Sequence, residues 1–349
     1  MTSPSEEFRM KMLAPIEDLL KEAVDGDVPP IPTGGRNWHL PGADFFGAGL
    51  HDPRSKRPKA PKQKPGAVNE AAFKEAMHAL NGMVGLHSAK RAIHRLADFA
   101  RIESERRRLK LPQSQVGFHC VFSGSAGTGK TSLARLLGKL LHALGLLKYG
   151  HTVEVDKSGL VGQYLGDTPM KVKRAFDEAD GGVLFIDEAY SLTHDEDDLY
   201  GHEAIDGIVK LMEDRRDRVV VIVAGYEKEM RKFIDSNPGL KSRFNRMIHF
   251  DDFDAGELLA IHKQMIRSSG FEASDGFLMK SELMWQTLYR DRITFEGNAR
   301  MVRSSLEIAY ENQARRLVRT PKRQRYELCE LLPEDLDGVE QQLRENYDD

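Results

Sequence analysis

The chain has 349 residues, of which 30% are charged and 40% hydrophobic, and this length is typical of two or three globular domains. The 51 basic residues nearly balance the 54 acidic ones, and the formal net charge of −3 argues against a whole-protein electrostatic grip on nucleic acid or anionic lipid. Two cysteines cannot crosslink a fold of this size, which predicts a reducing, cytoplasmic location. The acidic start MTSPSEEF predicts no signal peptide, and the longest aliphatic run, at 219–224, is too short to cross a bilayer.

Residues 1–68 are predicted to form an N-terminal extension that precedes the folded core. Within it, 53–66 is rich in proline and basic residues and lacks acids. This segment is interpreted as a solvated linker, with a tail for nucleic acid or an acidic partner as the alternative. Upstream, Trp38, Phe45 and Phe46 fit either docking on a partner subunit or packing on the chain's own body, and the sequence leaves both open.

Alternating strand and helix patterns from 69 to 252 predict an α/β domain. Apolar runs predict buried strands at 118–123, 152–155, 183–186 and 219–224. Apolar residues at helical spacing predict helices at 70–80, 88–108, 130–144, 170–179 and 202–213. Strands that are apolar on both faces and alternate with helices favour a parallel sheet flanked by helices.

Helical patterns dominate from 253 onward, at 255–268, 280–290 and 298–317, and predict a smaller helical domain over 253–320. Residues 321–349 run from arginine-rich to acidic sequence and are expected to be a C-terminal tail or a helical extension. The chain is therefore divided into an extension, an α/β domain, a helical domain and a C-terminal segment.

The residues between the strand at 118–123 and the helix at 130–144 match the phosphate-binding P-loop pattern in full. Its glycines let backbone N–H groups turn toward phosphate oxygens, and the N-terminus of the following helix adds partial positive charge. Lys130 supplies a charge to the β- and γ-phosphates, and the Thr131 hydroxyl is a ligand for Mg²⁺. The sequence therefore predicts an ATP site with Mg²⁺ at Gly124, Ser125, Ala126, Gly127, Thr128, Gly129, Lys130 and Thr131.

Two carboxylates follow the apolar strand at 183–186. Asp187 is expected to hold the Mg²⁺ ion, directly or through water, and Glu188 to polarise the attacking water as general base. An acidic pair here also fits a helix cap, but its place about fifty residues beyond a P-loop favours catalysis. These residues predict an enzyme that hydrolyses ATP to ADP and phosphate.

Several blocks, in this order, resemble the AAA+ ATPases and, within them, the CbxX/CfqX family, which includes red-type Rubisco activase and the ATPase domain of type VII secretion systems. Besides the P-loop they are MVGLHSAK (83–90), SGLVGQYLGDTP (158–169), GGVLFIDEAY (181–190), YGHEAID (200–206), VIVAGY (221–226), SNPGLKSRF (236–244) and GNAR (297–300). Together they cover residues 80–317, about two thirds of the chain. The resemblance implies an AAA+ P-loop domain followed by a helical lid domain, in a homo-hexameric ring.

The resemblance also implies roles for residues outside the P-loop. Val84, Gly85 and Leu86 would lie against the adenine base, where an apolar wall suits a flat ring. Arg243 matches the arginine finger that one subunit offers to its neighbour's γ-phosphate, and Arg246 is a second candidate. The alternative for Arg243 is a surface arginine at a helix end.

Two sensor positions follow from the same resemblance. Arg300 in GNAR matches the sensor-2 arginine of the lid, which would report the nucleotide state, and Arg303 lies one turn further on. Tyr226 stands at the sensor-1 position, where many relatives carry Asn or Thr, so the sequence departs from the common pattern there.

The segment Tyr164, Leu165 and Gly166 resembles the pore loop of AAA+ rings that thread peptides. Six copies around a channel would grip an extended chain with side chains of low entropy cost. A motor acting on nucleic acid would more often carry cations there, because phosphates need positive charge. The alternative is that Tyr164 packs on its own domain.

These observations predict a chaperone-like ATPase that remodels a protein client, with no membrane span and with nucleic acid disfavoured as a partner. A DNA-acting motor or loader with the same core is the alternative, supported by the basic linker. A scaffold that binds ATP without turnover is a third, opposed by the presence of Glu188 and Arg243. Rubisco activation and secretion are candidates within the family, but the sequence does not name the client.

Overall fold

The computed structural model describes residues 68–112, 114, 116–164, 166–193, 198–319 and 324–347. The linker at 53–66 and the three upstream aromatic residues therefore lie outside the described residues, as does Leu165 of the predicted pore loop. Within the described ranges, no helix is long and apolar enough to span a bilayer. The cytoplasmic location stays a prediction.

Five parallel strands form the sheet of the α/β domain, in the order β2-β3-β4-β1-β5. They are β1 (Cys120–Ser123), β2 (Thr152–Val155), β3 (Val183–Ile186), β4 (Val220–Gly225) and β5 (Met247–His249). The fold class predicted from the sequence is confirmed. The prediction missed β5 because this strand has only three residues, and the two outer ones are exposed.

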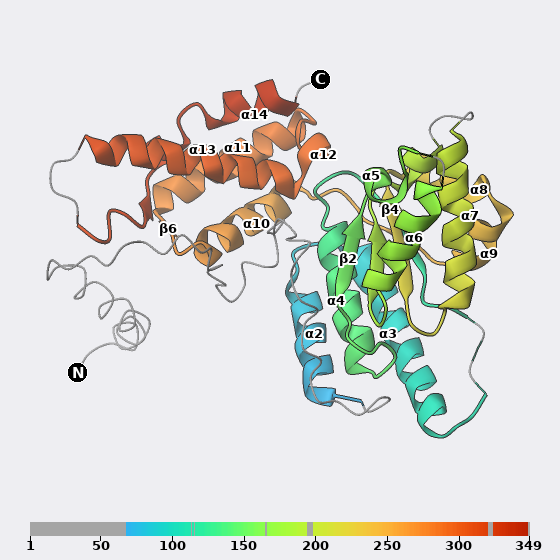
Figure 1. Cartoon of the computed structure of the whole chain (residues 1–349). Coiled ribbons are helices and arrows are strands. Elements are labelled where there is room, and N and C mark those ends of the chain that lie inside the picture. The colour runs from blue at the N-terminus through green and yellow to red at the C-terminus, as the bar shows by residue number, and fades with distance from the viewer. Residues whose placement is uncertain are drawn as a thin grey trace, which may run out of the picture. The chain divides into compact units, whose positions relative to one another are not determined.

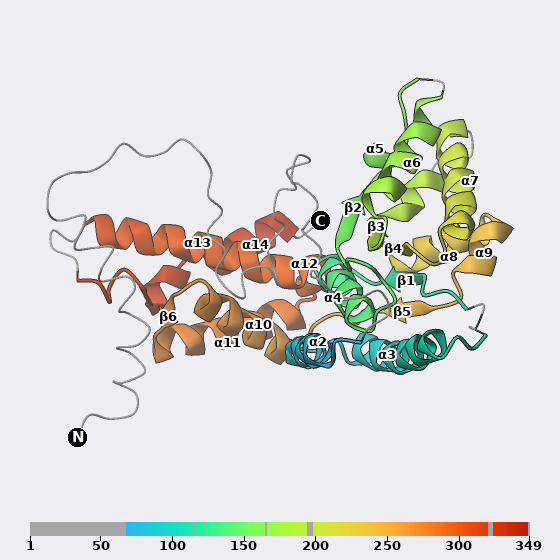
Figure 2. The same cartoon turned by 60° about the horizontal axis from the view of Figure 1, so that its bottom comes forward.

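Helices cover both faces of the sheet (Figures 1 and 2). One face packs against α2 (Glu70–Gly82), α3 (His87–Arg108) and α4 (Lys130–Ala143), and the other packs against α6 (Asp167–Glu178), α7 (Leu199–Asp214) and α8 (Glu227–Asp235). Successive residues of β1 enter different cores: Phe122 joins the first and Val121 the second. Burial on both faces explains why the strand sequences are apolar without alternation.

Short elements connect these layers. They are α5 (Lys157–Leu160) after β2, the 3₁₀ helix η2 (Ala189–Thr193) after β3, and α9 (Pro238–Arg243) before β5. Because all five strands run parallel, their carboxyl ends lie at one edge of the sheet. The segments that follow β1, β3 and β4 leave the sheet at that edge.

The helical domain contains α10 (Ala255–Ser268), α11 (Asp275–Arg290), α12 (Thr294–Gly297) and α13 (Ala299–Val318). Trp285 is fully buried in its core and donates a hydrogen bond from Nε1 to Nδ1 of His262 at 3.1 Å. Burial lowers the pKa of His262 to about 3, so the ring is neutral and accepts this bond. Helix α10 begins at a capping box formed by Asp254 and Glu257.

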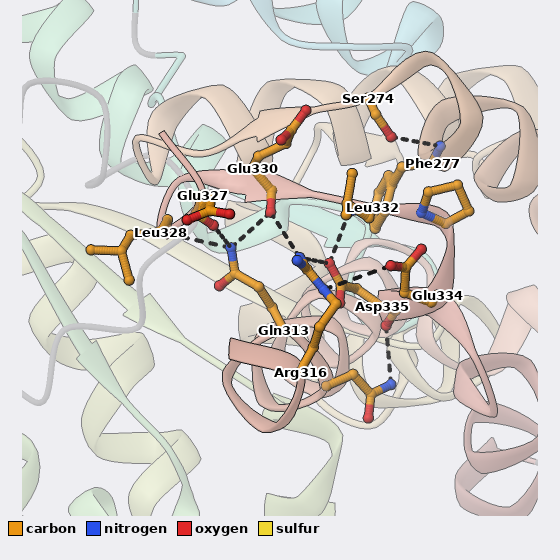
Figure 3. Close-up of polar contacts among 12 residues, drawn as sticks. Ser274, Phe277, Gln313, Arg316, Glu327, Leu328, Glu330, Leu332, Glu334 and Asp335 are labelled. Atoms are coloured by element: carbon orange, nitrogen blue, oxygen red, sulfur yellow. Dashed lines mark hydrogen bonds and ion pairs between the residues drawn. The ribbon is translucent and has the colours of Figure 1, made fainter. Parts of the chain in front are cut away.

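The C-terminal segment packs on this domain through β7 (Glu330–Leu331), η3 (Pro333–Leu336) and α14 (Val339–Tyr347), and β7 pairs with β6 (Glu272–Ala273). Figure 3 shows the polar contacts that hold it. Arg316 on α13 donates from Nε and Nη2 to the two carboxylate oxygens of Asp335, at 2.9 and 2.8 Å. The sequence predicts a helical domain that ends at 320, with a tail or a helical extension beyond. In the structure, residues 324–347 pack on that domain.

The end of α14 reaches the short turn between α12 and α13. The Tyr347 ring lies against Gly297, where an added Cβ would come within 2.6 Å of a ring carbon. The Tyr347 hydroxyl is 3.2 Å from Oγ of Ser304 on α13. The end of α14 therefore packs against the GNAR segment.

Candidate active site

The P-loop connects β1 to α4 and wraps around the N-terminus of that helix. Gly129 precedes the first helical residue, Lys130, in the left-handed region with φ 90°. This geometry turns the first N–H groups of α4 outward, and they carry the partial positive charge of a helix N-terminus. The loop is therefore shaped for an anion.

Lys130 lies within the loop and not in open solvent. Its Nζ donates to the backbone oxygens of Gly124 at 2.9 Å and Ser125 at 2.8 Å. Burial lowers its pKa to about 8, with Asp187 acting in the opposite direction and Arg300 in the same one. Because burial disfavours its charged form, the Lys130 ammonium would be stabilised by a bound phosphate.

The carboxyl end of β3 places its two acids beside the P-loop. Asp187 accepts a hydrogen bond from the backbone N–H of Glu188 at Oδ1, 3.1 Å away. Glu188 has φ 48°, which is uncommon for a residue with a side chain and costs conformational energy. Both Asp187 and Glu188 line the cavity beside the P-loop.

One cavity collects most of the residues that the sequence analysis singled out. Of the predicted nucleotide and catalytic residues it contains Val84, Leu86, Gly124, Ala126, Gly127, Thr128, Gly129, Lys130, Thr131, Asp187, Glu188, Tyr226 and Arg300, and Arg303 also lines it. Gly85 and Ser125 belong to the same two loops but are not among the lining residues. The P-loop, the ends of β3 and β4 and the start of α13 thus enclose one space.

The 83–86 loop is fixed by residues that the sequence analysis did not assign. Lys90 donates from Nζ to the backbone oxygens of Met83 and of Asn81, the latter at 3.3 Å. Glu257 of α10 lies so close to Gly85 that an added Cβ would be 2.6 Å from Oε1. Lys90 could have been noticed within MVGLHSAK, whereas Glu257 has no local signal because it is distant in sequence.

The GNAR segment contacts the P-loop directly. The backbone N–H of Ala299 donates to the oxygen of Gly127 at 3.3 Å. A Cβ added to Gly127 would lie 2.1 Å from the backbone oxygen of Gly297, so only glycine permits this approach. Arg300 follows and lines the cavity. The helical domain therefore supplies one wall of the site.

Four predicted residues, Arg243, Arg246, Tyr164 and Gly166, lie away from this cavity, and Gly166 is the N-cap residue of α6. Arg243, at the end of α9, is 3.3 Å from Glu213 through Nη2 and donates to the oxygen of Gly239 at 3.3 Å. Arg246 donates to the oxygen of Gly117 and its guanidinium lies 5.2 Å from the centre of the Phe99 ring. Tyr164 is 73% exposed on the segment between α5 and α6.

Metal-ligating groups are sparse in this site. Among the described residues, no cluster of three or more His, Cys, Asp or Glu side chains is placed to hold a metal ion. A hydroxyl such as that of Thr131 and one carboxylate such as that of Asp187 nevertheless suit Mg²⁺, which keeps several waters and takes further oxygens from a nucleotide's phosphates. The residues present therefore fit Mg²⁺ bound together with a nucleotide.

The fold and the cavity define a P-loop nucleotide-binding domain with a helical lid. Comparison with protein families agrees: residues 120–252 match the "ATPase family associated with various cellular activities (AAA)" and residues 254–346 match the AAA lid domain. The FIGL-1 AAA domain in complex with ADP has the same fold, with a TM-score of 0.53 and 16% identity over 75% of this chain and 83% of that one.

Curated relatives are much closer in sequence. A CfxQ homologue of Cyanidium caldarium is 38% identical over 73% of this chain and 89% of its own length, and the chloroplastic ribulose bisphosphate carboxylase/oxygenase activase of Cyanidioschyzon merolae is 38% identical over 73% and 87%. Stage V sporulation protein K of Bacillus subtilis is 36% identical over 76% and 82%. The chain belongs to the AAA ATPase family, in the CfxQ/CbxX group, and is a nucleotide-binding protein.

Proposed function

We propose that this protein hydrolyses ATP with Mg²⁺ and uses the energy to remodel a protein client. The observation that carries the proposal is the convergence of Lys130, Asp187, Glu188 and Arg300 on one cavity from three separate segments. A site for binding alone would need the P-loop but would have no use for a strained glutamate at the end of β3.

Each residue has a chemical task in this proposal. The N–H groups at the start of α4 and the Lys130 ammonium bind the phosphates, and Thr131 and Asp187 hold Mg²⁺, which would neutralise charge on the phosphate oxygens. Glu188 accepts a proton from the attacking water. Arg300 places a positive charge from the lid in the cavity, and Val84 and Leu86 provide an apolar surface for the base.

The proposal includes a ring of like subunits, with six as the expected number. Arg243 is outside the cavity of its own chain, so as an arginine finger it acts on the cavity of a neighbour. Its present contact with Glu213 is a partly exposed ion pair, which contributes little stability and is easily exchanged for a phosphate.

A pore contact with a polypeptide is the proposed route to the client. Tyr164 presents a large aromatic side chain to solvent, which argues against the alternative that it packs on its own domain. An exposed aromatic ring grips apolar and backbone groups without needing charge on the client. The client itself is left open, since one relative is named for Rubisco activation and another for sporulation.

The first experiment replaces the proposed general base. We expect Glu188→Gln to bind ATP as tightly as the wild type while its kcat falls by about 100-fold or more, because proton transfer contributes a factor of this size. Glu178→Gln, on the exposed end of α6, is the matched control and should keep wild-type turnover. Unchanged turnover in Glu188→Gln would refute the catalytic assignment.

The same variant can identify the client. In ATP, the Glu188→Gln protein should retain a bound polypeptide that the Tyr164→Ala, Glu188→Gln double variant loses. ATPase activity stimulated by DNA and abolished by high salt would instead support the DNA-acting motor.

A further inference from the structure

Asn298, between α12 and α13, is a buried polar residue in an unusual backbone conformation. Its side chain has no solvent exposure, and its backbone has φ 47° and ψ −126°, a region that glycine adopts freely and other residues rarely enter. A strained residue in a buried position persists only where its surroundings hold it there.

The side chain bonds to three segments that are far apart in sequence. Nδ2 donates to the backbone oxygen of Ala126 at 3.2 Å and to Oδ1 of Asp252 at 2.9 Å, and it lies 3.3 Å from the oxygen of Phe295. Oδ1 accepts from the backbone N–H of Phe253 at 3.0 Å. The carboxylate on one side and the N–H donor on the other fix the orientation of the amide.

These bonds replace the role that asparagine usually has at this position. Asn298 is the N-cap residue of α13, and asparagine is among the best N-caps, yet its side chain makes no capping hydrogen bond to that helix. The amide reaches instead to the P-loop and to the connection between the two domains. The Asn298 side chain therefore stabilises a contact between the two domains and not the N-terminus of α13.

The contact holds two successive P-loop carbonyls. Ala126 is bound by the Asn298 side chain, and Gly127 is bound by the backbone of Ala299. Carbonyls fixed on the lid side leave the N–H groups of the loop free to face the cavity. Arg300, two residues after Asn298, lines that cavity, so the same turn sets the position of the loop and of the arginine.

We propose that Asn298 is a positioning residue that fixes the P-loop and Arg300 relative to each other, so that nucleotide affinity depends on the lid. The inference rests on the proposed nucleotide chemistry of this cavity. It makes Asn298 the point at which a movement of the lid would pull on the phosphate-binding loop.

Two variants test this role. Asn298→Gly accepts the backbone conformation without strain and removes only the side chain. Asn298→Asp keeps the shape but turns two donors into a carboxylate that faces Asp252 and the oxygen of Ala126. We expect the dissociation constant for ADP with Mg²⁺ to rise about 10-fold in Asn298→Gly and further in Asn298→Asp, because lost buried hydrogen bonds and added repulsion are of that size.

Asn312→Ala is the matched control. Asn312 lies on the same helix and donates to the backbone oxygens of Asp335 and Asp337, so its loss destabilises the lid without touching the P-loop. We expect a lower melting temperature and an unchanged dissociation constant. If Asn312→Ala weakens ADP binding as much as Asn298→Gly does, Asn298 acts only through lid stability and the inference is wrong.

A double-mutant cycle with Arg300→Ala separates positioning from simple packing. Asn298→Gly should weaken binding much less in the Arg300→Ala background than in the wild type, because one effect runs through the other. Independent, multiplicative losses would overturn the inference. The Asn298→Asp variant gives the same cycle if the glycine variant does not fold.

Failure of the wild type to bind ADP would refute the proposed function itself. This outcome is thereby distinguished from a failure of the inference about Asn298.

Discussion

At the scale of single residues, the site is built from groups held in costly states. Lys130 is a partly buried ammonium, Glu188 has a left-handed backbone, and Asn298 combines burial with a backbone region suited to glycine. A bound triphosphate would offset the first cost by supplying negative charge. The P-loop is therefore poised to bind an anion before any anion arrives.

The lowered pKa of Lys130 gives a pH dependence with a definite sign. We expect the dissociation constant for ADP to rise about tenfold from pH 7 to pH 9, because the lysine loses its proton in the free protein above a pKa of about 8. The step should be absent in Lys130→Met. Calorimetric titration over this pH range measures both; a flat profile in the wild type would show that the lysine keeps its proton.

The same group affects stability in the opposite direction. In the unfolded chain Lys130 returns to its ordinary pKa of 10.5, so between about pH 8 and pH 10.5 the unfolded state binds more protons than the folded state. The contribution of Lys130 to the free energy of unfolding of the nucleotide-free protein therefore rises with pH in this window, whereas the affinity for nucleotide falls.

Which site residues the sequence could reveal depended on how local their signal is. The P-loop and the pair Asp187 and Glu188 are contiguous and follow apolar strands, so the pattern alone predicts them. Asn298 and Ala126 are 172 positions apart, and no sequence pattern near either residue indicates the hydrogen bond between them. Glu257 and Gly85 are hidden for the same reason.

At the scale of elements, the parallel sheet was predictable and the end of the lid was not. Strands buried on both faces have an unbroken apolar sequence, whereas β5, with three residues, does not. The segment 324–347 contains two residues of strand, one 3₁₀ turn and one short helix, too little regular structure for periodicity to detect. It is held on the lid by the pairing of β7 with β6, by buried apolar side chains and by side-chain hydrogen bonds to α13.

One of these contacts is the ion pair in which Arg316 donates two hydrogen bonds to Asp335. Asp335 is 1% exposed, so Arg316→Ala leaves a buried carboxylate without its partner and should lower the free energy of unfolding of the lid by about 3 kcal/mol. Urea unfolding followed by Trp285 fluorescence measures this loss. Arg315→Ala, the exposed neighbour, should change it by less than about 0.5 kcal/mol; equal losses in both variants would contradict the account.

At the scale of the whole molecule, the proposed arginine finger lies outside the cavity of its own chain. Arg243 forms an ion pair with Glu213 of its own chain and lies outside the cavity that holds Lys130 and Glu188. A site completed by a neighbour makes turnover a property of the assembly. The ring proposed from the sequence thus gains a specific test in subunit mixing.

We expect Arg243→Ala to lower kcat by about 1,000-fold, the size of effect typical of an arginine finger. Lys130→Ala should be equally inactive because it does not hold the phosphates. An equal mixture of the two should recover about a quarter of wild-type activity, since that share of interfaces joins an intact cavity to an intact finger. Steady-state ATPase assays measure this recovery, and mixtures in which Arg246→Ala replaces Arg243→Ala are the control. If activity does not recover, Arg243 either acts within its own chain or has no catalytic role.

The close contacts that join Gly127 to Gly297 and Gly297 to Tyr347 have a consequence for how this family varies over evolution. A side chain at Gly297 would strike the Tyr347 ring, and a side chain at Gly127 would strike the backbone of Gly297. Substitutions at Gly297 and Tyr347 are thereby tied together, whereas Gly127 meets only backbone atoms and is restricted to glycine whatever stands at 297. In an alignment of relatives, the loss of the tyrosine and the loss of the second glycine should occur together, as a covarying pair that links the C-terminal helix to the phosphate-binding loop.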